Sequence, residues 1–260
     1  MLLEDRVAIV TGGAKEIGLH ISLGLAEEGA RVVIADVDEK AGKEAVRTIG
    51  ERYGREALYL DVDVSKESQV RDMVQSVVER FSSVSILVNN AGIMGPVERI
   101  EDITEEEWDK TFAVNIKRMV FCSKHAVPHM KDKKEGCIVN IASISGKRAL
   151  PLRLPYTTTK MGVIGFSRSL AAEVGEWGIR VNSVCPGSVT GARQEHVFRG
   201  IMKATGKSWD QVKKEKAEVT ALKTFVDPVY IANCVVFLCS DKSWVITGQD
   251  INVCGGSIMY

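Results

Sequence analysis

Short apolar runs alternate with helical segments along the whole chain, and this alternation constrains the fold more than any other feature. The runs are rich in Val and Ile and lack the polar alternation of strands exposed on one face. They cover residues 6–13, 31–36, 57–64, 85–92, 137–143, 179–187 and 249–253. Continuous apolar strands separated by helices predict a parallel sheet covered by helices on both faces.

Helix signals lie between these runs. The segments 39–53, 66–81 and 155–174 have helical character, and Thr104 with Glu107 has the spacing of a capping box before a long helix that carries Asn115. Asp227 followed by Pro228 is typical of a helix N-terminus. Because crossovers between parallel strands are right-handed, this order predicts an α/β fold: one doubly wound domain of seven strands over residues 1–260.

Residues 190–226 form the one long connection. Connections of this length usually carry their own helices or act as lids. Two weak helical patterns cover 194–204 and 208–219, and Ser208 with Gln211 has the spacing of a second capping box. Because the segment follows the carboxyl end of the sixth strand, we expect a helical lid over a substrate cleft.

Charge and composition exclude several classes of function. Basic and acidic residues balance at 34 each, and no basic block of nucleic-acid type occurs. No apolar run is long enough for a membrane span, and the N-terminal residues lack a secretory pattern. The six cysteines are scattered without C-x-x-C pairs, and His125 with His129 lacks further ligands for a metal. We expect a cytoplasmic protein with reduced thiols, no metal, no nucleic-acid or membrane partner, and a small-molecule substrate.

A serine, a tyrosine and a lysine suggest the chemistry. Ser143 precedes Tyr156 by thirteen residues, and Lys160 follows Tyr156 by four. Pro155 suits the first turn of a helix, which places Tyr156 and Lys160 one turn apart on the same face. A nearby ammonium favours the phenolate form of a tyrosine. Tyr156 is therefore a candidate general acid/base, with Ser143 as hydrogen-bonding partner of the same substrate oxygen.

The first strand ends in a glycine turn, residues 11–18, beside a helix N-terminus, which suits a pyrophosphate. Asp36 ends the second strand, where its carboxylate can accept hydrogen bonds from a ribose 2′-OH and would repel a 2′-phosphate. Lys15 could instead pair with that phosphate. Because desolvating a carboxylate beside a phosphate costs more than a mobile lysine gains, we predict NAD rather than NADP.

Six motifs occur in order along the chain: TGGAKEIG (11–18), NNAG (89–92), Asn115, Ser143, Tyr156-x-x-x-Lys160 and Pro186-Gly187. In this set the chain resembles the short-chain dehydrogenase/reductase family over essentially its whole length. The resemblance implies a Rossmann-like fold and hydride transfer between a nicotinamide cofactor and an alcohol or ketone. It also implies a homotetramer formed through the helices that carry Asn115 and Tyr156.

The resemblance further implies roles for individual residues. Tyr156 would be the acid/base, Lys160 would assist it and bind the nicotinamide ribose, and Ser143 would polarise the substrate oxygen. Asn115 would hold a water that relays protons to Lys160. The remaining expected cofactor contacts are Gly12, Lys15, Ile17, Gly18, Asp36, Asp63, Val64, Asn90, Ala91, Gly92, Val189 and Thr190.

Two positions depart from the family pattern. Glu16 stands where a second glycine is usual, and a side chain there restricts φ and brings a carboxylate near the pyrophosphate. We expect it to weaken cofactor binding unless it turns to solvent. Gly191 replaces a threonine that often follows the Pro-Gly pair, with Thr190 one position early.

The substrate is the least constrained feature. We expect a secondary alcohol: a small polyol, a sugar-like molecule or a hydroxy acid. Lys147, Arg148 and Arg153 flank the Ser and Tyr, so one of them is a candidate for binding an anionic group, the alternative being a solvent or subunit contact. Further candidates for the pocket lining are Met94, Gln194, His196 and Trp209.

Two other functions remain open. One is an NADPH-dependent 3-oxoacyl-thioester (acyl-carrier-protein) reductase, against which Asp36 argues. The other is a non-catalytic dinucleotide-sensing module, against which the complete set of Asn115, Ser143, Tyr156 and Lys160 argues.

Overall fold

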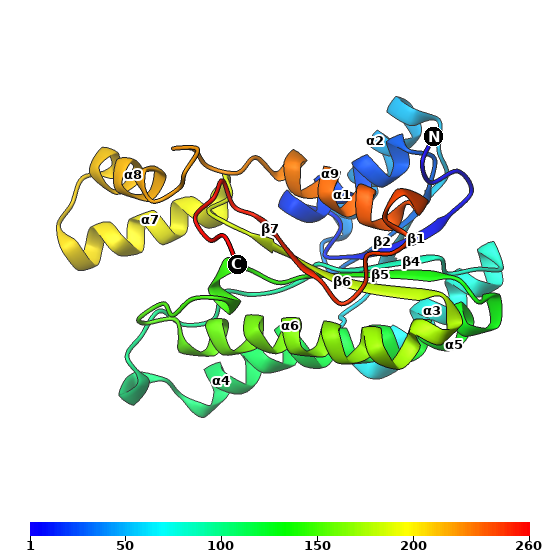
Figure 1. Ribbon diagram of the computed structural model, residues 1–260, viewed down its shortest axis with the longest axis horizontal. Coiled ribbons are helices and arrows are strands. Elements are labelled where there is room, and N and C mark those ends of the chain that lie inside the picture. Colours follow the sequence, from blue (N-terminus) through cyan, green and yellow to red (C-terminus); the bar gives the residue numbers. More distant parts are fainter.

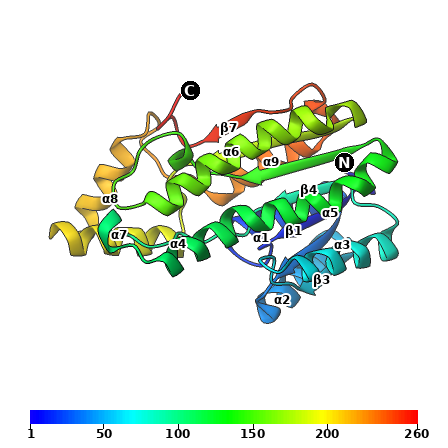
Figure 2. The same ribbon diagram turned by 90° about the horizontal axis from the view of Figure 1, so that it is seen from below.

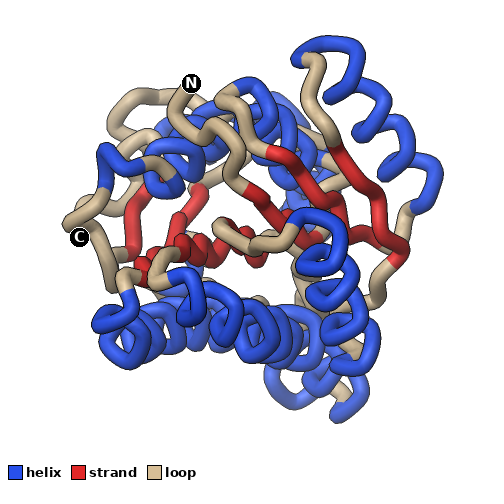
Figure 3. The backbone as a smooth tube through the Cα atoms, turned by 90° about the vertical axis from the view of Figure 1, so that its right-hand side faces the viewer, coloured by secondary structure: helices blue, strands red, loops and turns tan.

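The computed structural model describes residues 1–260, apart from the side chains at positions 193, 196 and 204. A seven-stranded parallel sheet in the order β3-β2-β1-β4-β5-β6-β7 runs through the molecule (Figures 1 and 3). This confirms the predicted fold class. The strands are β1 (Val7–Thr11), β2 (Arg31–Asp36), β3 (Ala57–Asp61), β4 (Ile86–Asn89), β5 (Gly136–Ile141), β6 (Ile179–Pro186) and β7 (Asp250–Val253).

Helices cover both faces of the sheet (Figures 1 and 2). One layer consists of α1 (Glu16–Glu27), α2 (Glu39–Tyr53) and α9 (Pro228–Cys239). The opposite layer consists of α3 (Glu67–Phe81), α4 (Glu105–Phe112), α5 (Arg118–Lys133) and α6 (Leu154–Val174).

The two-sided cover explains why the strands are apolar throughout. In β1, Ala8 and Val10 pack in the core on the side of α1 and α9. Their neighbours Val7 and Ile9 pack in the core on the side of α3 and α5. All four side chains are buried, as expected when successive residues of a strand point to opposite faces that are both covered.

The strand order reverses at β1, which pairs with β2 on one side and β4 on the other. Thr11 and Asn89, the last residues of β1 and β4, lie in register. Ligands of open α/β sheets bind outside the carboxyl ends of the strands at such a reversal. The glycine turn and the NNAG segment both leave the sheet at this edge.

The connection 190–226 contains two helices, α7 (Ala192–Thr205) and α8 (Trp209–Glu218), close to the two predicted patterns. They extend beyond the end of the sheet, apart from the two helical layers (Figure 1). Ser208 caps α8 with a hydrogen bond of 3.3 Å from the Gln211 amide, so the second capping box is confirmed. The capping box at Thr104 is confirmed as well.

The third strand is shorter than predicted. It ends at Asp61, and residues 62–64 belong to the following turn. The Asp63 carboxylate holds that turn, because it accepts hydrogen bonds from the Ser65 amide and hydroxyl at 3.0 and 2.6 Å. These hydrogen bonds, the hydroxyl first, outweigh the effect of burial and lower the pKa of Asp63 below 3.8.

All six cysteines are free thiols, and only Cys234 is not buried. No group of three His, Cys, Asp or Glu residues among the described side chains is arranged to hold a metal ion. Within the described residues, no helix combines the length and the apolar character needed to span a membrane.

Candidate functional site

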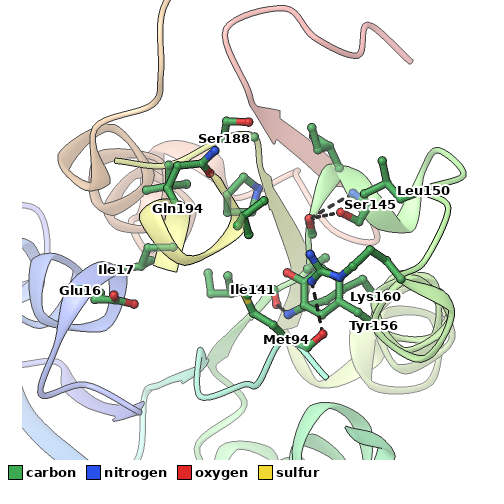
Figure 4. Close-up of a pocket in the computed structure, with 18 of the residues that line it drawn as sticks. Glu16, Ile17, Met94, Ile141, Ser145, Leu150, Tyr156, Lys160, Ser188 and Gln194 are labelled. Carbon is green, nitrogen blue, oxygen red and sulfur yellow. Dashed lines mark hydrogen bonds between the residues drawn. The ribbon is translucent and has the colours of Figure 1, made fainter. Parts of the chain in front are cut away.

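Helix α6 carries Tyr156 and Lys160. It begins at Leu154 with Pro155 in its first turn, as the sequence predicts. The Lys160 ammonium lies 5.6 Å from the centroid of the Tyr156 ring and donates a hydrogen bond of 2.8 Å to the carbonyl oxygen of Ile141. Figure 4 shows both side chains on the same side of a pocket.

Ser143 lies just beyond β5 and caps the short 3₁₀ turn Ile144–Gly146. Its Oγ accepts a hydrogen bond of 3.1 Å from the Ser145 amide and donates one of 3.1 Å to the Ser145 hydroxyl. Ser145 is not among the site residues that the sequence predicts. Two serines separated by one residue after a strand are the pattern that could have indicated it, because such hydroxyls often cap local turns.

Asn115 lies in a π-helical stretch, Ala113–Lys117, between α4 and α5, where the sequence predicts one continuous helix. Such bulges are frequent at functional sites. The buried Asn115 amide accepts from the Ile93 N–H at 2.9 Å and donates to the Ile93 carbonyl at 2.9 Å and to Thr159 Oγ1 at 3.1 Å. Thr159 Oγ1 donates to the carbonyl oxygen of Tyr156 at 2.8 Å. The amide of Asn115 therefore braces the helix that carries Tyr156.

The glycine turn leaves no room for side chains at two positions. Gly12 has a φ of +61°, and a Cβ there would lie 2.8 Å from Cα of Ala91. A Cβ on Gly18 would lie 1.9 Å from the carbonyl oxygen of Gly12. The Asn90 amide also donates to the carbonyl oxygen of Gly12 at 2.9 Å. This packed turn at the start of α1 fits the close approach of a pyrophosphate.

Glu16 begins α1 with a φ of +47°, in the left-handed region that costs free energy for any residue with a Cβ. Its side chain is exposed and lines the pocket. The departure from the family pattern therefore has a backbone consequence, since the fold retains the conformation that glycine would adopt more easily.

Asp36 is held by the backbone at the end of β2. Its two carboxylate oxygens accept hydrogen bonds of 3.1 Å from the Ala14 and Asp38 amides. Lys15 forms an ion pair with Asp38. The hydrogen bond between them raises the pKa of Lys15 above 10.5 and lowers the pKa of Asp38 below 3.8. The lysine that could have favoured a 2′-phosphate thus has a carboxylate partner.

A cavity of about 180 Å³ lies at the carboxyl end of the sheet. Figure 4 shows Tyr156, Lys160 and Ser145 on one side of it, and Glu16, Ile17 and Gln194 on the other. The predicted site residues that line this cavity are Ile17, Asn90, Ser143, Arg153, Tyr156, Lys160, Val189 and Thr190. Those that do not line it are Gly12, Lys15, Gly18, Asp36, Asp63, Val64, Ala91, Gly92 and Asn115.

The three basic residues that are candidates for substrate contacts differ in whether they reach the cavity. The hypothesis for Lys147 is wrong, because its ammonium pairs with Asp250 at 2.6 Å, away from the cavity. Arg148 and Arg153 line the cavity. The Arg153 guanidinium lies 4.7 Å from the centroid of the Tyr156 ring and donates to the Met94 carbonyl at 3.3 Å.

The other candidates for the pocket lining also differ in whether they reach the cavity. Met94 and Gln194 line the cavity, whereas Trp209 packs against Phe198 with ring centroids 5.2 Å apart. The side chain of His196 lies outside the described residues. Lys216 of α8 lines the cavity and was not predicted, because it reaches the site only through the tertiary placement of α8.

Three features are together typical of a nucleotide-dependent oxidoreductase with a doubly wound fold. They are the parallel sheet whose strand order reverses at β1, the glycine turn, and the pair of Tyr156 and Lys160. Residues 12–257 match a family model described as enoyl-(acyl carrier protein) reductase. The chain belongs to the short-chain dehydrogenase/reductase family, whose members bind NAD or NADP.

Curated relatives span the same length. An uncharacterized oxidoreductase of Thermotoga maritima is 37% identical over 257 residues, covering 99% of this chain and 99% of the relative. A 3-oxoacyl-[acyl-carrier-protein] reductase FabG of Staphylococcus epidermidis is 36% identical, with 98% of this chain and 100% of the relative covered. These relatives extend over the whole of the fold and the site.

Solved structures agree with the fold. NAD⁺-bound xylitol dehydrogenase superposes with a TM-score of 0.95 at 28% identity, covering 98% of this chain and 100% of that chain. L-Sorbose reductase from Gluconobacter frateurii, complexed with NADPH and L-sorbose, superposes with a TM-score of 0.92 at 32% identity, covering 99% of this chain and 98% of that chain. Relatives with either cofactor thus share this architecture.

Proposed function

We propose that this protein is an NAD-dependent oxidoreductase that interconverts a small secondary alcohol and its ketone. The observation that carries the proposal is one cavity lined by Ser143, Tyr156 and Lys160 together with Ile17 and Asn90 from the nucleotide side. A reacting carbon in this cavity would lie beside a proton donor and within reach of a nicotinamide.

The contacts in the site support a separate proposed role for each side chain. Tyr156 moves the proton to or from the substrate oxygen, and Ser143 hydrogen-bonds the same oxygen. The Ser145 amide orients Ser143 Oγ at 3.1 Å. Lys160, whose ammonium lies 5.6 Å from the centroid of the Tyr156 ring, assists the proton transfer and binds the nicotinamide ribose. NAD, when bound, supplies the hydride-transfer chemistry.

The arrangement fits a dinucleotide. Gly12 and Gly18 let the turn fold tightly against Ala91 and against itself, and the N-terminus of α1 at this turn suits a pyrophosphate. Gly12, Lys15, Ile17 and Gly18 are therefore the proposed contacts on the phosphate side. The proposed contacts with the rest of the dinucleotide are Asp36, Asp63, Val64, Asn90, Ala91, Gly92, Val189 and Thr190.

Asp36 supports NAD over NADP. Its carboxylate is fixed by two backbone amides at the end of β2 and would oppose a 2′-phosphate there. Lys15, the cation that could offset this repulsion, is paired with Asp38. The isosteric variant Asp36→Asn should reduce the ratio of kcat/KM for NAD to that for NADP.

The cavity volume favours a small substrate. About 180 Å³ is below the roughly 300–1,000 Å³ of pockets that enclose drug-sized ligands. The named activities of two structural relatives, xylitol dehydrogenase and L-sorbose reductase, also concern polyols and sugars. We therefore propose a polyol, a sugar-like molecule or a hydroxy acid.

A second candidate function is reduction of a 3-oxoacyl thioester on acyl carrier protein. The FabG relatives, at 35–36% identity over nearly the whole chain, favour this alternative. It predicts NADPH as the preferred cofactor and a 3-oxoacyl thioester as the best substrate. The two proposals therefore predict different preferred cofactors and different preferred substrates, and both preferences can be measured.

One screen separates them. Purified enzyme is assayed by nicotinamide absorbance with secondary polyols and hydroxy acids, and with a 3-oxoacyl thioester, each with the NAD and NADP couples. Higher kcat/KM for polyols or hydroxy acids with NAD supports the main proposal. Higher kcat/KM for the thioester with NADPH overturns it. Nucleotide binding without turnover of either class would favour the dinucleotide-sensing module.

We further propose that segment 190–226 acts as a lid and that the protein is a homo-oligomer. Gln194 of α7 and Lys216 of α8 line the cavity, which supports the lid. Val120 of α5 and Met161 of α6 are 38% and 60% exposed, as expected if these helices form a subunit interface. Solution mass measured by light scattering tests the oligomer.

A further inference from the structure

Four cations line the cavity near Tyr156, and they come from three parts of the chain. Lys160 belongs to α6 and Arg153 is the N-cap residue of that helix, Arg148 follows the 3₁₀ turn after Ser143, and Lys216 belongs to α8. The only carboxylate among the described lining residues is Glu16, on the opposite side from Tyr156 in Figure 4. The catalytic side of the cavity is therefore strongly positive.

Two of these cations have no acidic partner in the described part of the chain. Neither Arg148 nor Lys216 forms an ion pair there, and Arg148 Nε is buried without a hydrogen-bond partner. Glu215, the neighbour of Lys216, is instead paired with Lys207 at 2.7 Å. A buried donor without a partner costs free energy that a bound acceptor would recover.

Arg148 and Lys216 also act on each other. Burial, and next the charge of Arg148, lower the pKa of Lys216 below 10.5, while Glu215 acts in the opposite direction. Two like charges that approach each other beside a cavity are stabilised when an anion lies between them. On α8, the adjacent Lys213 and Lys214 are exposed, so Lys216 is distinguished by its inward position.

From these contacts we infer that Arg148 and Lys216 form a subsite for an anionic group of the substrate: a carboxylate, a sulfonate or a phosphate. This inference rests on the proposed function, because the subsite selects which secondary alcohol reaches Tyr156. Arg148 offers the planar donor set that suits such oxyanions. Lys216 adds a charge from α8, so binding of the anion would also hold the proposed lid over the cavity.

The test uses a matched set of three-carbon alcohols. Glycerate, 2,3-dihydroxypropane-1-sulfonate and glycerol 1-phosphate each carry a secondary hydroxyl beside a different anion, and 1,2-propanediol is neutral. Binding to the full-length enzyme with NAD present is measured by calorimetry, and turnover by NADH absorbance. We expect at least one anion to bind about tenfold or more tightly than the diol. The best of the three identifies the anion.

The variants Arg148→Gln and Lys216→Gln should each weaken binding of that anion about tenfold or more and leave binding of 1,2-propanediol unchanged. Lys216→Arg should restore most of the affinity. Lys213→Gln, an exposed change on the same helix, should have no effect. Thermal unfolding of each variant confirms that it is folded.

Equal affinity of the wild-type enzyme for the anions and the neutral diol would overturn the inference. So would loss of anion binding in Lys213→Gln to the same extent as in Lys216→Gln. Because binding is measured directly, failure of the subsite is distinguishable from failure of the proposed function. The latter would appear as absence of NADH formation with all four alcohols.

Discussion

The Lys160 ammonium donates a hydrogen bond of 2.8 Å to the carbonyl oxygen of Ile141, the last residue of β5. Ser143 follows Ile141 by two residues, and Tyr156 precedes Lys160 by one helical turn. This buried contact therefore ties the helix that carries the tyrosine to the strand end that precedes the serine. Preorganisation of this kind lowers the cost of reaching the transition state.

Thr159 is predicted to position Tyr156 without touching substrate. Thr159→Val removes the hydroxyl that bridges the Asn115 amide and the Tyr156 carbonyl. The unfolding free energy should fall by about 1–3 kcal/mol, because a buried amide donor loses its partner. Turnover should fall as well, because the first turn of α6 loses its brace. Chemical denaturation and steady-state assays measure the two effects.

Thr159→Ser is the matched control. It keeps the hydroxyl and removes one methyl group, so turnover should stay near the wild-type value. If the Val and Ser variants lose turnover equally, the hydrogen bonds of Thr159 have no positioning role.

Much of this architecture could be predicted from the sequence because its causes are local. The apolar strands, the cap at Asp227 and Pro155 in the first turn of α6 each specify their structure within a few residues. The alignment of Ser143, Tyr156 and Lys160 around one cavity follows from sheet topology, which the alternation of strands and helices also indicates.

The remaining features depend on tertiary placement. Lys147 and Arg148 are adjacent in sequence, yet Lys147 turns to Asp250 and Arg148 lines the cavity. Lys216 reaches the cavity from a helix more than fifty residues further along than Tyr156. The π-helical turn at Asn115 depends on contacts with Ile93 and Thr159, which periodicity does not encode.

Glu16→Gly is expected to improve both stability and cofactor binding. Glycine adopts the φ of +47° without strain, so the unfolding free energy should rise by about 1 kcal/mol. Removal of a carboxylate near the proposed pyrophosphate position should also lower the Kd for NAD. Denaturant titration and calorimetry report the two quantities separately.

Two further variants separate the effect of the positive φ on stability from the effect of the Glu16 charge on cofactor binding. Ser82→Gly, at a φ of +58° at the end of α3, should raise stability alone. Glu16→Gln should tighten NAD binding without the gain in stability. An unchanged Kd for NAD in both Glu16 variants would show that the carboxylate does not oppose the cofactor.

Asp250 is expected to contribute to the acid sensitivity of the fold. Burial alone would raise its pKa, but hydrogen bonds from Lys147 and Arg168 outweigh burial and lower the pKa below 3.8. A depressed pKa means that the stabilisation is present above pH 3.8 and is lost as the pH falls further. Asp250→Asn should therefore cost about 1–3 kcal/mol at pH 7, with the difference from wild type shrinking below pH 3.8.

Thermal unfolding between pH 7 and pH 3 measures this dependence. Asp72→Asn, which removes a carboxylate from an exposed pair with Arg71, is the control and should change stability little at any pH. A constant difference between Asp250→Asn and wild type across the range would contradict the assignment.

Tyr156→Phe, compared with the wild-type enzyme and with Tyr230→Phe on the exposed surface of α9, tests the role of Tyr156 most directly. Turnover of the best alcohol and the Kd for NAD are measured on each protein. Loss of the hydroxyl should reduce kcat by about 10²–10⁴-fold, the usual contribution of general acid–base catalysis, and leave the Kd for NAD unchanged. A Tyr156→Phe enzyme that keeps the wild-type kcat would contradict proton transfer by Tyr156.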